Sequence, residues 1–299
     1  MRTSLLFLLA LSYSGILLGQ TQDHKSIKVE TLAPNFRANG AVSVDQDGHV
    51  NISEYGVFIN TGGNGNSIFK LDASGKILDT ISNLSGPMGT VTDANNNLYV
   101  NNDNNMTRGQ ILRISPEGDR KVFATLPGWP SGMAMDTQGT LYVTNYNAPR
   151  IDMIDAHGTV STFAEDPRLS GCVGIDFTSK GELVVSNFYT ATIFLINSKG
   201  VIKELVTLKD IVVQGWGIGY LTVIDDTIYA TGIAVSKLFK VSLDGSYEIF
   251  TGNGKAESVN GILQSASLNY PNGISSDKKN KILYISEYGP GGGIRKIQL

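Results

Sequence analysis

The stretch Trp129–Phe163 reads WPSGMAMDTQGTLYVTNYNAPRIDMIDAHGTVSTF, and it decides the fold class. It divides into four short segments in which apolar and polar residues alternate: GMAMD, TLYVTN, RIDMID and TVSTF. The joints between them are Gln138-Gly139, Asn147-Ala148-Pro149 and His157-Gly158, which are residue types found in tight turns. The stretch therefore predicts four consecutive antiparallel strands.

The second of these segments recurs along the whole chain. Its copies are HVNISEY, LYVNND, LYVTNY, LVVSNF, IYATG and LYISEY, which contain or begin at Val50, Leu98, Leu141, Leu183, Ile228 and Leu283. Each copy follows a glycine-bearing segment and precedes a segment rich in Ile or Leu. The copies are about 40 to 55 residues apart, which is the period of propeller blades. We therefore predict an all-β fold, a six-bladed β-propeller with four antiparallel strands in each blade.

The two ends of the repeat region complement each other. The sixth copy stops at Leu299, directly after its third strand, whereas the segment 26–32 has the pattern of the missing fourth strand. We expect this N-terminal strand to pair with the segment 294–297 and to close the ring, which removes an exposed sheet edge. The propeller then occupies residues 26–299. The best candidate for a helix is the loop insertion 254–268.

The N-terminus indicates export. Arg2 precedes the apolar run Leu5–Leu11, and small and polar residues follow, as in a secretory signal peptide over residues 1–20. An uncleaved membrane anchor is the alternative, although the run is shorter than the about 20 residues of a membrane-spanning helix. We expect a secreted or periplasmic protein that has no membrane span after cleavage and is a monomer. Its net charge of -3 and scattered basic residues argue against a nucleic-acid partner.

Cysteine and histidine chemistry is not favoured. Cys172 is the only cysteine, so no intramolecular disulfide can form, and its apolar neighbours predict a buried residue. His24, His49 and His157 are dispersed and lack the spacing of a zinc site.

The repeats resemble a known family. Pro271-Asn272-Gly273-Ile274, followed by Ile282–Ile285 and Ile294–Ile297, is similar to an NHL repeat. The six-bladed layout of residues 26–299 also resembles the senescence-marker/gluconolactonase superfamily, which has many secreted and periplasmic members. This resemblance implies a divalent metal held by Glu, Asn and Asp at the starts of the first strands. The comparable positions here carry no carboxylate, and they read Asn39-Gly40, Met88, Ser131, Val173, Ile218 and Asn272.

The candidate polar site lies at the ends of the second strands, which share one face of the ring with the starts of the first strands. These ends are Glu54, Asn102, Asn145, Asn187, Gly232 and Glu287. Because blades one and six are neighbours in a closed ring, Glu54 and Glu287 could together hold Ca²⁺ or another divalent cation, or act as an acid/base pair. Asp103 is a third catalytic candidate. We expect the three asparagines to orient a ligand, or alternatively to tie down the following turn.

The same face gathers aromatic residues. Trp129, Tyr146, Phe188 and Trp216 are predicted to form the walls of a site for an apolar, aromatic or sugar ligand, the alternative being a plugged channel. The resulting hypothesis is an exported propeller that binds a small, partly apolar or cyclic molecule, with a gluconolactonase-like hydrolase favoured. A non-catalytic propeller that binds a ligand or a protein, and a lyase or isomerase, are the alternatives, so whether the protein is an enzyme stays open.

Overall fold

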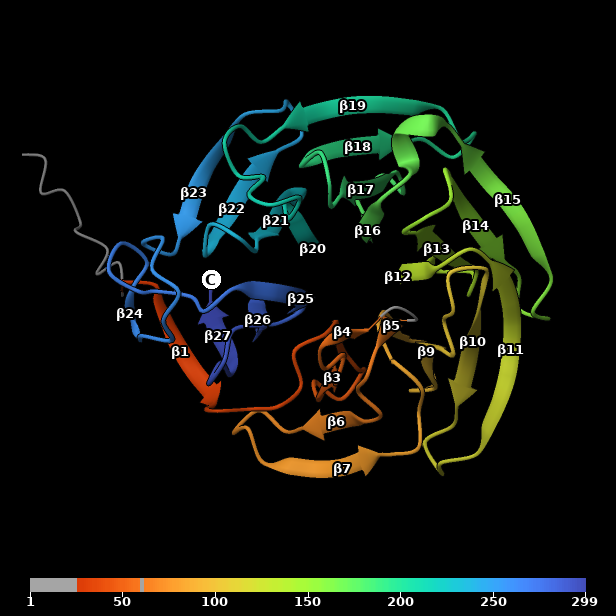
Figure 1. Cartoon of the computed structure of the whole chain (residues 1–299), viewed down its shortest axis with the longest axis horizontal. Helices are drawn as coiled ribbons and strands as arrows, with labels where there is room; N and C mark the ends of the chain where they lie inside the picture. Colours follow the sequence, from red (N-terminus) through yellow and green to blue (C-terminus); the bar gives the residue numbers. More distant parts are fainter. Residues whose placement is uncertain (1–25, 60–61) are drawn as a thin grey trace, which may run out of the picture.

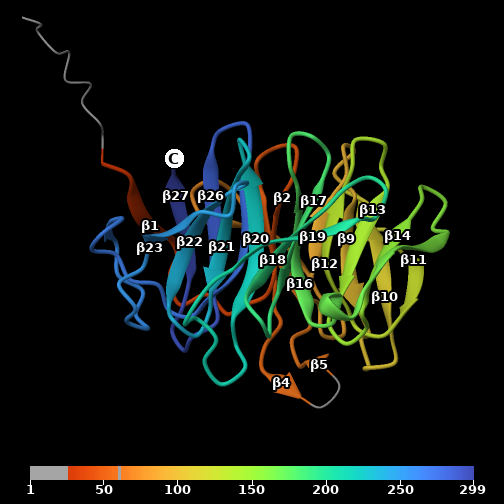
Figure 2. The same cartoon turned by 90° about the horizontal axis from the view of Figure 1, so that it is seen from above.

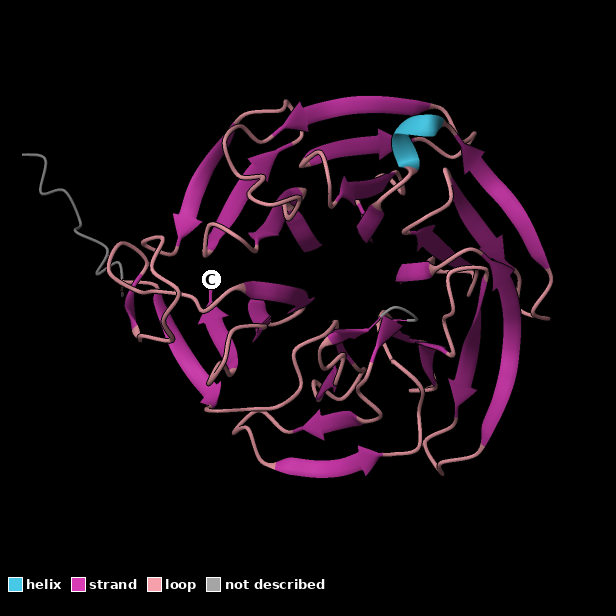
Figure 3. Cartoon of the chain, in the orientation of Figure 1, coloured by secondary structure: helices cyan, strands magenta, loops and turns pink. Residues whose placement is uncertain are grey.

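Six antiparallel sheets stand around a central axis as the blades of a β-propeller (Figure 1). The structure is a computed structural model that describes residues 26–59 and 62–299, so the predicted signal peptide at 1–20 lies outside the described residues. Almost every element is a strand (Figure 3), and the one helical turn among the described residues is η1 (Pro167–Leu169). The predicted fold class, with four-stranded antiparallel blades, is confirmed. No helix in the described part of the chain is long and apolar enough to cross a membrane.

The strands of blades 1 to 5 follow one another in chain order from the axis outward. Blade 1 contains β2 (Val42–Val44), β3 (Val50–Ser53), β6 (Ile68–Leu71) and β7 (Ile77–Ile81). Blade 2 contains β8 (Thr90–Thr92), β9 (Leu98–Asn102), β10 (Arg108–Ile114) and β11 (Arg120–Pro127). Blade 3 contains β12 (Pro130–Met135), β13 (Leu141–Asn145), β14 (Arg150–Ile154) and β15 (Val160–Glu165).

Blades 4 and 5 repeat this order, whereas the sheet of blade 6 has five strands and takes its outer two from other parts of the chain. Blade 4 contains β16 (Cys172–Phe177), β17 (Leu183–Asn187), β18 (Thr192–Ile196) and β19 (Ile202–Thr207). Blade 5 contains β20 (Ile218–Ile224), β21 (Thr227–Gly232), β22 (Lys237–Ser242) and β23 (Tyr247–Thr251). Blade 6 contains β25 (Pro271–Asp277), β26 (Ile282–Glu287), β27 (Ile294–Gln298), β1 (Lys28–Ala33) and β24 (Gly261–Ile262).

The N-terminal strand occupies the fourth position of blade 6. β1 pairs antiparallel with β27, and the register places Val29 opposite Ile297 and Thr31 opposite Arg295. The outer side of β1 pairs with β24, which belongs to the insertion 254–268. This insertion is therefore a loop with a two-residue strand, and the helix considered for it does not form. Its backbone bonds instead to neighbouring segments, as in the Asn253 N–H to Ala266 carbonyl bond of 3.1 Å.

The core lies between the blades. Period-two alternation gives every strand one side chain per two residues on each sheet face, so both faces of a blade can pack on neighbouring blades. Six apolar clusters result, one at each interface between neighbouring blades, including the interface of blade 6 with blade 1. Cys172 is buried in the cluster between blades 3 and 4, as predicted, and burial raises the pKa of its thiol.

The two faces of the ring differ. The mouth face, where first strands begin and second strands end, carries the hairpin of β4 (Phe58–Ile59) and β5 (Gly62–Gly63), which projects from it in the edge-on view of Figure 2. The opposite face carries the turns between first and second strands. In one such turn the Asp136 carboxylate accepts the N–H groups of Gln138 and Thr140 at 2.9 and 2.8 Å. These turns follow from local chemistry.

Candidate ligand-binding site

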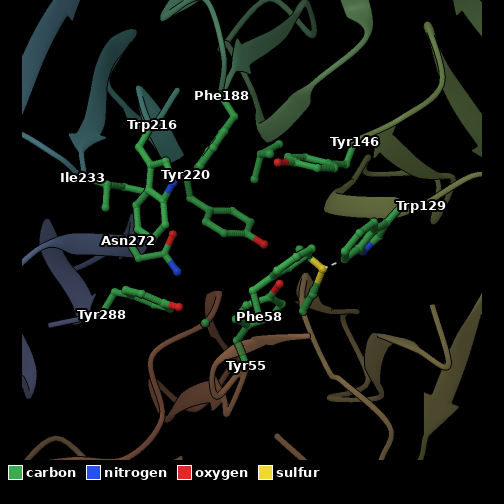
Figure 4. A pocket seen from close by; sticks show the side chains of 13 residues that line it. Tyr55, Phe58, Trp129, Tyr146, Phe188, Trp216, Tyr220, Ile233, Asn272 and Tyr288 are labelled. Atoms are coloured by element: carbon green, nitrogen blue, oxygen red, sulfur yellow. Dashed lines mark hydrogen bonds between the residues drawn. The ribbon is translucent and has the colours of Figure 1, made fainter. Parts of the chain in front are cut away.

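An aromatic cavity of about 280 Å³ opens on the mouth face, at the axis of the ring (Figure 4). Eight of the thirteen lining residues are aromatic, and none of these described residues is charged. The lining residues are Gly40, Tyr55, Phe58, Met88, Trp129, Tyr146, Val173, Phe188, Trp216, Tyr220, Ile233, Asn272 and Tyr288. Since all six blades contribute, the cavity exists only in the assembled ring.

A chain of ring contacts forms much of the wall. Tyr146 lies 5.3 Å from Trp129 and 5.9 Å from Phe188, measured between ring centroids. Trp216 continues the chain, at 6.2 Å from Phe188 and 5.4 Å from Tyr288. Most of these pairs are edge-to-face or tilted, which are favourable arrangements of aromatic quadrupoles. The four predicted wall residues Trp129, Tyr146, Phe188 and Trp216 are therefore brought together around one cavity.

The position of the rings follows from the end of the second strand. Tyr146, Phe188 and Tyr288 each come directly after that strand. Each donates its backbone N–H at 2.8 Å to a carbonyl of the segment leading into the first strand, namely that of Trp129, Gly171 or Tyr270. Repeated backbone anchoring thus directs side chains from several blades toward the axis.

Trp129 is held from two sides. Its indole N–H points at the sulfur of Met88, with a distance of 3.0 Å between Nε1 and Sδ. Its ring face lies parallel to Phe58, with centroids 6.0 Å apart and an interplanar angle of 15°. Because Phe58 is 57% exposed, the β4–β5 hairpin places an aromatic ring at the rim of the cavity.

Tyrosine hydroxyls and one amide supply the polar groups of the cavity. Figure 4 shows the hydroxyls of Tyr55, Tyr146, Tyr220 and Tyr288 directed toward its interior. Burial raises the pKa of Tyr55, and Tyr288 raises it further. Burial likewise raises the pKa of Tyr146 and of Tyr220. These three hydroxyls are therefore neutral at physiological pH and can donate or accept hydrogen bonds.

The predicted ligand-orienting asparagines have a different function in the structure. Asn145 accepts the N–H of Trp129 at 2.9 Å and donates to the Pro127 carbonyl at 2.8 Å. Asn187 donates to the carbonyls of Arg168 and Ser170, and Asn102 accepts the N–H of Ser85 at 2.7 Å. None of the three lines the cavity. They hold the loops that enter the first strands. Asn145 and Asn187 also accept N–H groups of the turn that follows the second strand, from Ala148 and from Tyr189 and Thr190. A role in orienting a ligand stays a prediction.

Glu287 also holds a loop. Its side chain is fully buried, and Oε1 accepts a hydrogen bond from Arg295 Nη1 at 2.9 Å, in an ion pair whose partner is equally buried. The same carboxylate accepts the Asn269 and Gly293 N–H groups at 2.9 and 3.0 Å and the Ser258 hydroxyl. It does not line the cavity. A carboxylate with this many donors, one of them a guanidinium, does not fit the expected role of cation ligand.

Glu54 and Asp103, the other predicted acidic residues, are not among the cavity residues either. Glu54 lies 3.4 Å from Arg37 Nε and receives the Asn66 N–H at 3.4 Å. Asp103 is 44% exposed and lies 3.7 Å from Arg108 Nη2. The structure therefore gives each carboxylate a basic neighbour of its own and does not bring the predicted catalytic set into the cavity.

One group of potential metal ligands lies on the opposite face. Oxygen and nitrogen atoms of Asp45, Asp47 and His49 come within 4.8 Å of one another. However, Asp45 Oδ2 is 2.7 Å from the Lys70 ammonium, and its Oδ1 accepts the Asp47 and His49 N–H groups. The Asp47 carboxylate accepts a hydrogen bond from the Asn96 side-chain amide at 2.8 Å. The cluster is thus a turn neutralised by a lysine, and it does not fit a Ca²⁺ site.

Sequence reasoning missed part of the wall. Tyr55 and Tyr288 occupy the same position after the second strand as Tyr146 and Phe188, so that register was the signal for them. Ile233 directly follows Gly232, the last residue of β21, so the same register was also the signal for it. Phe58 comes from the connection between the second and third strands of blade 1, where no period marks a cavity residue. Tyr220 lies within the first strand of blade 5.

Comparisons with known proteins find solved structures with a similar fold. No protein-family model and no curated protein matches the sequence. The structure is similar to virginiamycin B lyase from Staphylococcus aureus, with a TM-score of 0.58 and 20% identity over 86% of this chain and 79% of that one. It is similar to a gluconolactonase from Xanthomonas campestris, with a TM-score of 0.65 and 13% identity over 91% and 90% of the two chains.

A third similar structure is an auxiliary nutrient binding protein from Bacteroides thetaiotaomicron, with a TM-score of 0.69 and 17% identity over 91% of this chain and 76% of that one. At these identities the likeness concerns the fold. The expected resemblance to gluconolactonase-like propellers is confirmed at that level, and the neighbours include enzymes and a binding protein.

Proposed function

We propose that this protein is an exported, non-catalytic propeller that binds an uncharged, cyclic or aromatic small molecule in the aromatic cavity. The observation that carries the proposal is the composition of the wall: eight aromatic residues and no charged side chain. Rings of a ligand would stack against Trp129, Phe188 and Trp216, and its hydroxyl or carbonyl groups would bond to the tyrosine hydroxyls. The volume of about 280 Å³ is near the lower end of ligand pockets, about 300–1,000 Å³.

The same wall disfavours hydrolysis. A general acid or base acts best with a pKa near the working pH, and a metal needs oxygen or nitrogen ligands free of other partners. The cavity offers tyrosines, three of them with a raised pKa, and the predicted carboxylates Glu54 and Glu287 bond elsewhere. The gluconolactonase-like and lyase alternatives therefore find no carboxylate, histidine, serine or cysteine among the described lining residues, whereas a binding role needs none.

The two tryptophans of the chain provide the experiment. Both Trp129 and Trp216 line the cavity, so tryptophan fluorescence, excited selectively over that of the tyrosines, reports on it. We expect 4-methylphenol and 4-nitrophenyl β-D-glucopyranoside to change this fluorescence saturably. Phe188→Leu should weaken binding about two- to tenfold, because a ring contact is worth about 0.5–1.5 kcal/mol. Phe163→Leu is the matched control, since Phe163 is also half-buried but packs on Tyr142 in blade 3.

The pH profile separates binding from catalysis. A tyrosine with a raised pKa stays protonated until above its usual value of about 10, so affinity for a neutral probe should be constant from pH 5 to pH 9. δ-Gluconolactone should not be turned over above the uncatalysed rate. Turnover with a bell-shaped pH profile, or equal affinities for the Phe188→Leu and Phe163→Leu variants, would overturn the proposal.

A further inference from the structure

The first strands share one position that is small in every blade except the fifth. Strand pairing aligns the blades with one another. In each blade, one first-strand residue pairs with the second-strand residue that stands two places before Glu54 or its equivalent. These first-strand residues are Val42, Thr90, Met133, Ile175, Leu221 and Ile274. The residues just before them are Ala41, Gly89, Gly132, Gly174, Tyr220 and Gly273, in blade order. Blade 5 thus places a tyrosine where four blades have glycine and one has alanine.

Close packing of the first strands explains why glycine occupies this position in four blades. Near the axis the first strands approach one another closely, and a Cβ at Gly132 would collide with the Val173 carbonyl oxygen of the next blade. A Cβ at Gly273 would likewise collide with the carbonyl of Gly40. In blade 5 the glycine stands one place earlier, where a Cβ on Gly219 would lie 2.8 Å from the Asn272 carbonyl. The close approach is therefore kept at Gly219, and the next position carries a large side chain.

The backbone at Tyr220 is held as it is at two of the four glycines, Gly132 and Gly273. The N–H groups of Gly132, Tyr220 and Gly273 donate to a hydroxyl of the adjacent second strand, at 2.8, 3.1 and 3.0 Å. The acceptors are Thr144, Thr231 and Ser286. Because the backbone arrangement is shared, the blade fold does not require the ring of Tyr220.

The ring of Tyr220 lies between two cavities. It is 8% exposed and lines both the aromatic cavity and a second, polar cavity of about 530 Å³. The polar cavity is bordered by the turns of the opposite face, including those with Asp45 and Asp277. Figure 4 shows the Tyr220 ring among the side chains of the aromatic cavity, with its hydroxyl directed inward. Among the described residues that line these two cavities, Tyr220 is the one common to both.

We propose that Tyr220 is a specificity-determining residue that sets the depth of the aromatic cavity. Its ring is the floor on which a ligand ends, so molecules long enough to reach the polar cavity are excluded. This inference rests on the proposed function, because it names the class of ligand that the same cavity selects: short, compact ring systems without a long tail.

A series of 4-alkylphenols, from methyl to pentyl, tests the floor by tryptophan fluorescence. With the natural protein, affinity should stop rising once the added methylenes reach Tyr220. Tyr220→Gly restores the residue of the other blades, and its affinity should keep rising about fourfold for each methylene that fills the space of the removed ring. Tyr220→Phe keeps the ring and should keep the natural length limit.

The outcomes separate this inference from the proposed function. An equal length limit in the natural protein and a folded Tyr220→Gly variant would overturn the role of Tyr220 and leave ligand binding intact. Binding of no phenol by any variant would overturn both. If Tyr220→Gly does not fold, Tyr220→Leu provides the comparison, and a length limit unchanged from the natural protein overturns the inference in the same way.

Discussion

Asn145, Asn187 and Glu287 occupy the same position, the last residue of the second strand, and bond to the loop that enters the first strand. An amide can donate and accept, so asparagine satisfies carbonyls and N–H groups of that loop together. A carboxylate only accepts, and blade 6 accordingly surrounds Glu287 with donors, including the buried Arg295. The loop that enters the first strand is thus held by an amide side chain in blades 3 and 4 and by a carboxylate in blade 6.

The Glu287–Arg295 pair leads to a stability prediction. Replacing Glu287 by alanine leaves a buried guanidinium without its counter-charge, which typically costs about 3–5 kcal/mol. We expect the Glu287→Ala variant to lose that much free energy of unfolding in urea denaturation. Glu257→Ala changes an exposed carboxylate in the insertion 254–268, next to the Ser258 that bonds Glu287, and should stay within about 0.5 kcal/mol of the natural protein. Unchanged stability together with lost binding would instead make Glu287 a ligand residue.

At the scale of elements, β1 carries the next prediction. Its Val29 is fully buried between blades 5 and 6, whereas the adjacent Glu30 is exposed. Val29→Ala should lower the free energy of unfolding by about 2 kcal/mol, through the lost methyl burial and the resulting cavity, and Glu30→Ala should have little effect. A chain beginning at Pro34 exposes the edge of β27 and should aggregate. A truncated chain that melts like the natural protein would show that β1 is dispensable.

The elements were predictable because their signals are local. Alternation with period two and the turn residues are both contained in one blade, and six copies remove the ambiguity of a single one. The aromatic wall was partly predictable for the same reason, since Tyr146 and Phe188 follow the second strand at a fixed register. The insertion 254–268 has no repeat partner, and its pairing with β1 joins segments more than 200 residues apart.

The roles of the polar residues depended on tertiary partners. Glu287 is bonded by Ser258, Asn269 and Arg295, none of which the second-strand pattern identifies. Nor does the pattern alone indicate that Tyr220 faces the channel, although its departure from the glycines of the other blades was visible in the sequence. An alignment of the six blades would have identified Tyr220, because it is the one large residue at a position that is otherwise glycine or alanine.

At the scale of the whole molecule, all six blades build one cavity, and both tryptophans lie in its wall. A ligand that fills this cavity would contact several blades at once, so under the proposed function binding would stabilise the ring as a unit. In contrast, the turns of the opposite face close within single blades through their own aspartates, as Asp136 does. This difference between the faces is why we place the function on the mouth face.

The start of the mature chain can be predicted from the leader and from the position of β1. Arg2 and the apolar run Leu5–Leu11 predict export with cleavage near Gln20, and the first strand begins only at Lys28. Cleavage there would remove the leader and leave β1 whole, whereas cleavage after Ala33 would remove the fourth strand of blade 6. Mass spectrometry of the native protein should therefore find an N-terminus within a few residues of Gln20. Leu8→Arg places a charge in the apolar run and should block both export and processing. Soluble cytoplasmic protein that retains Met1 would contradict export, and a mature chain starting beyond Ala33 would contradict the role of β1.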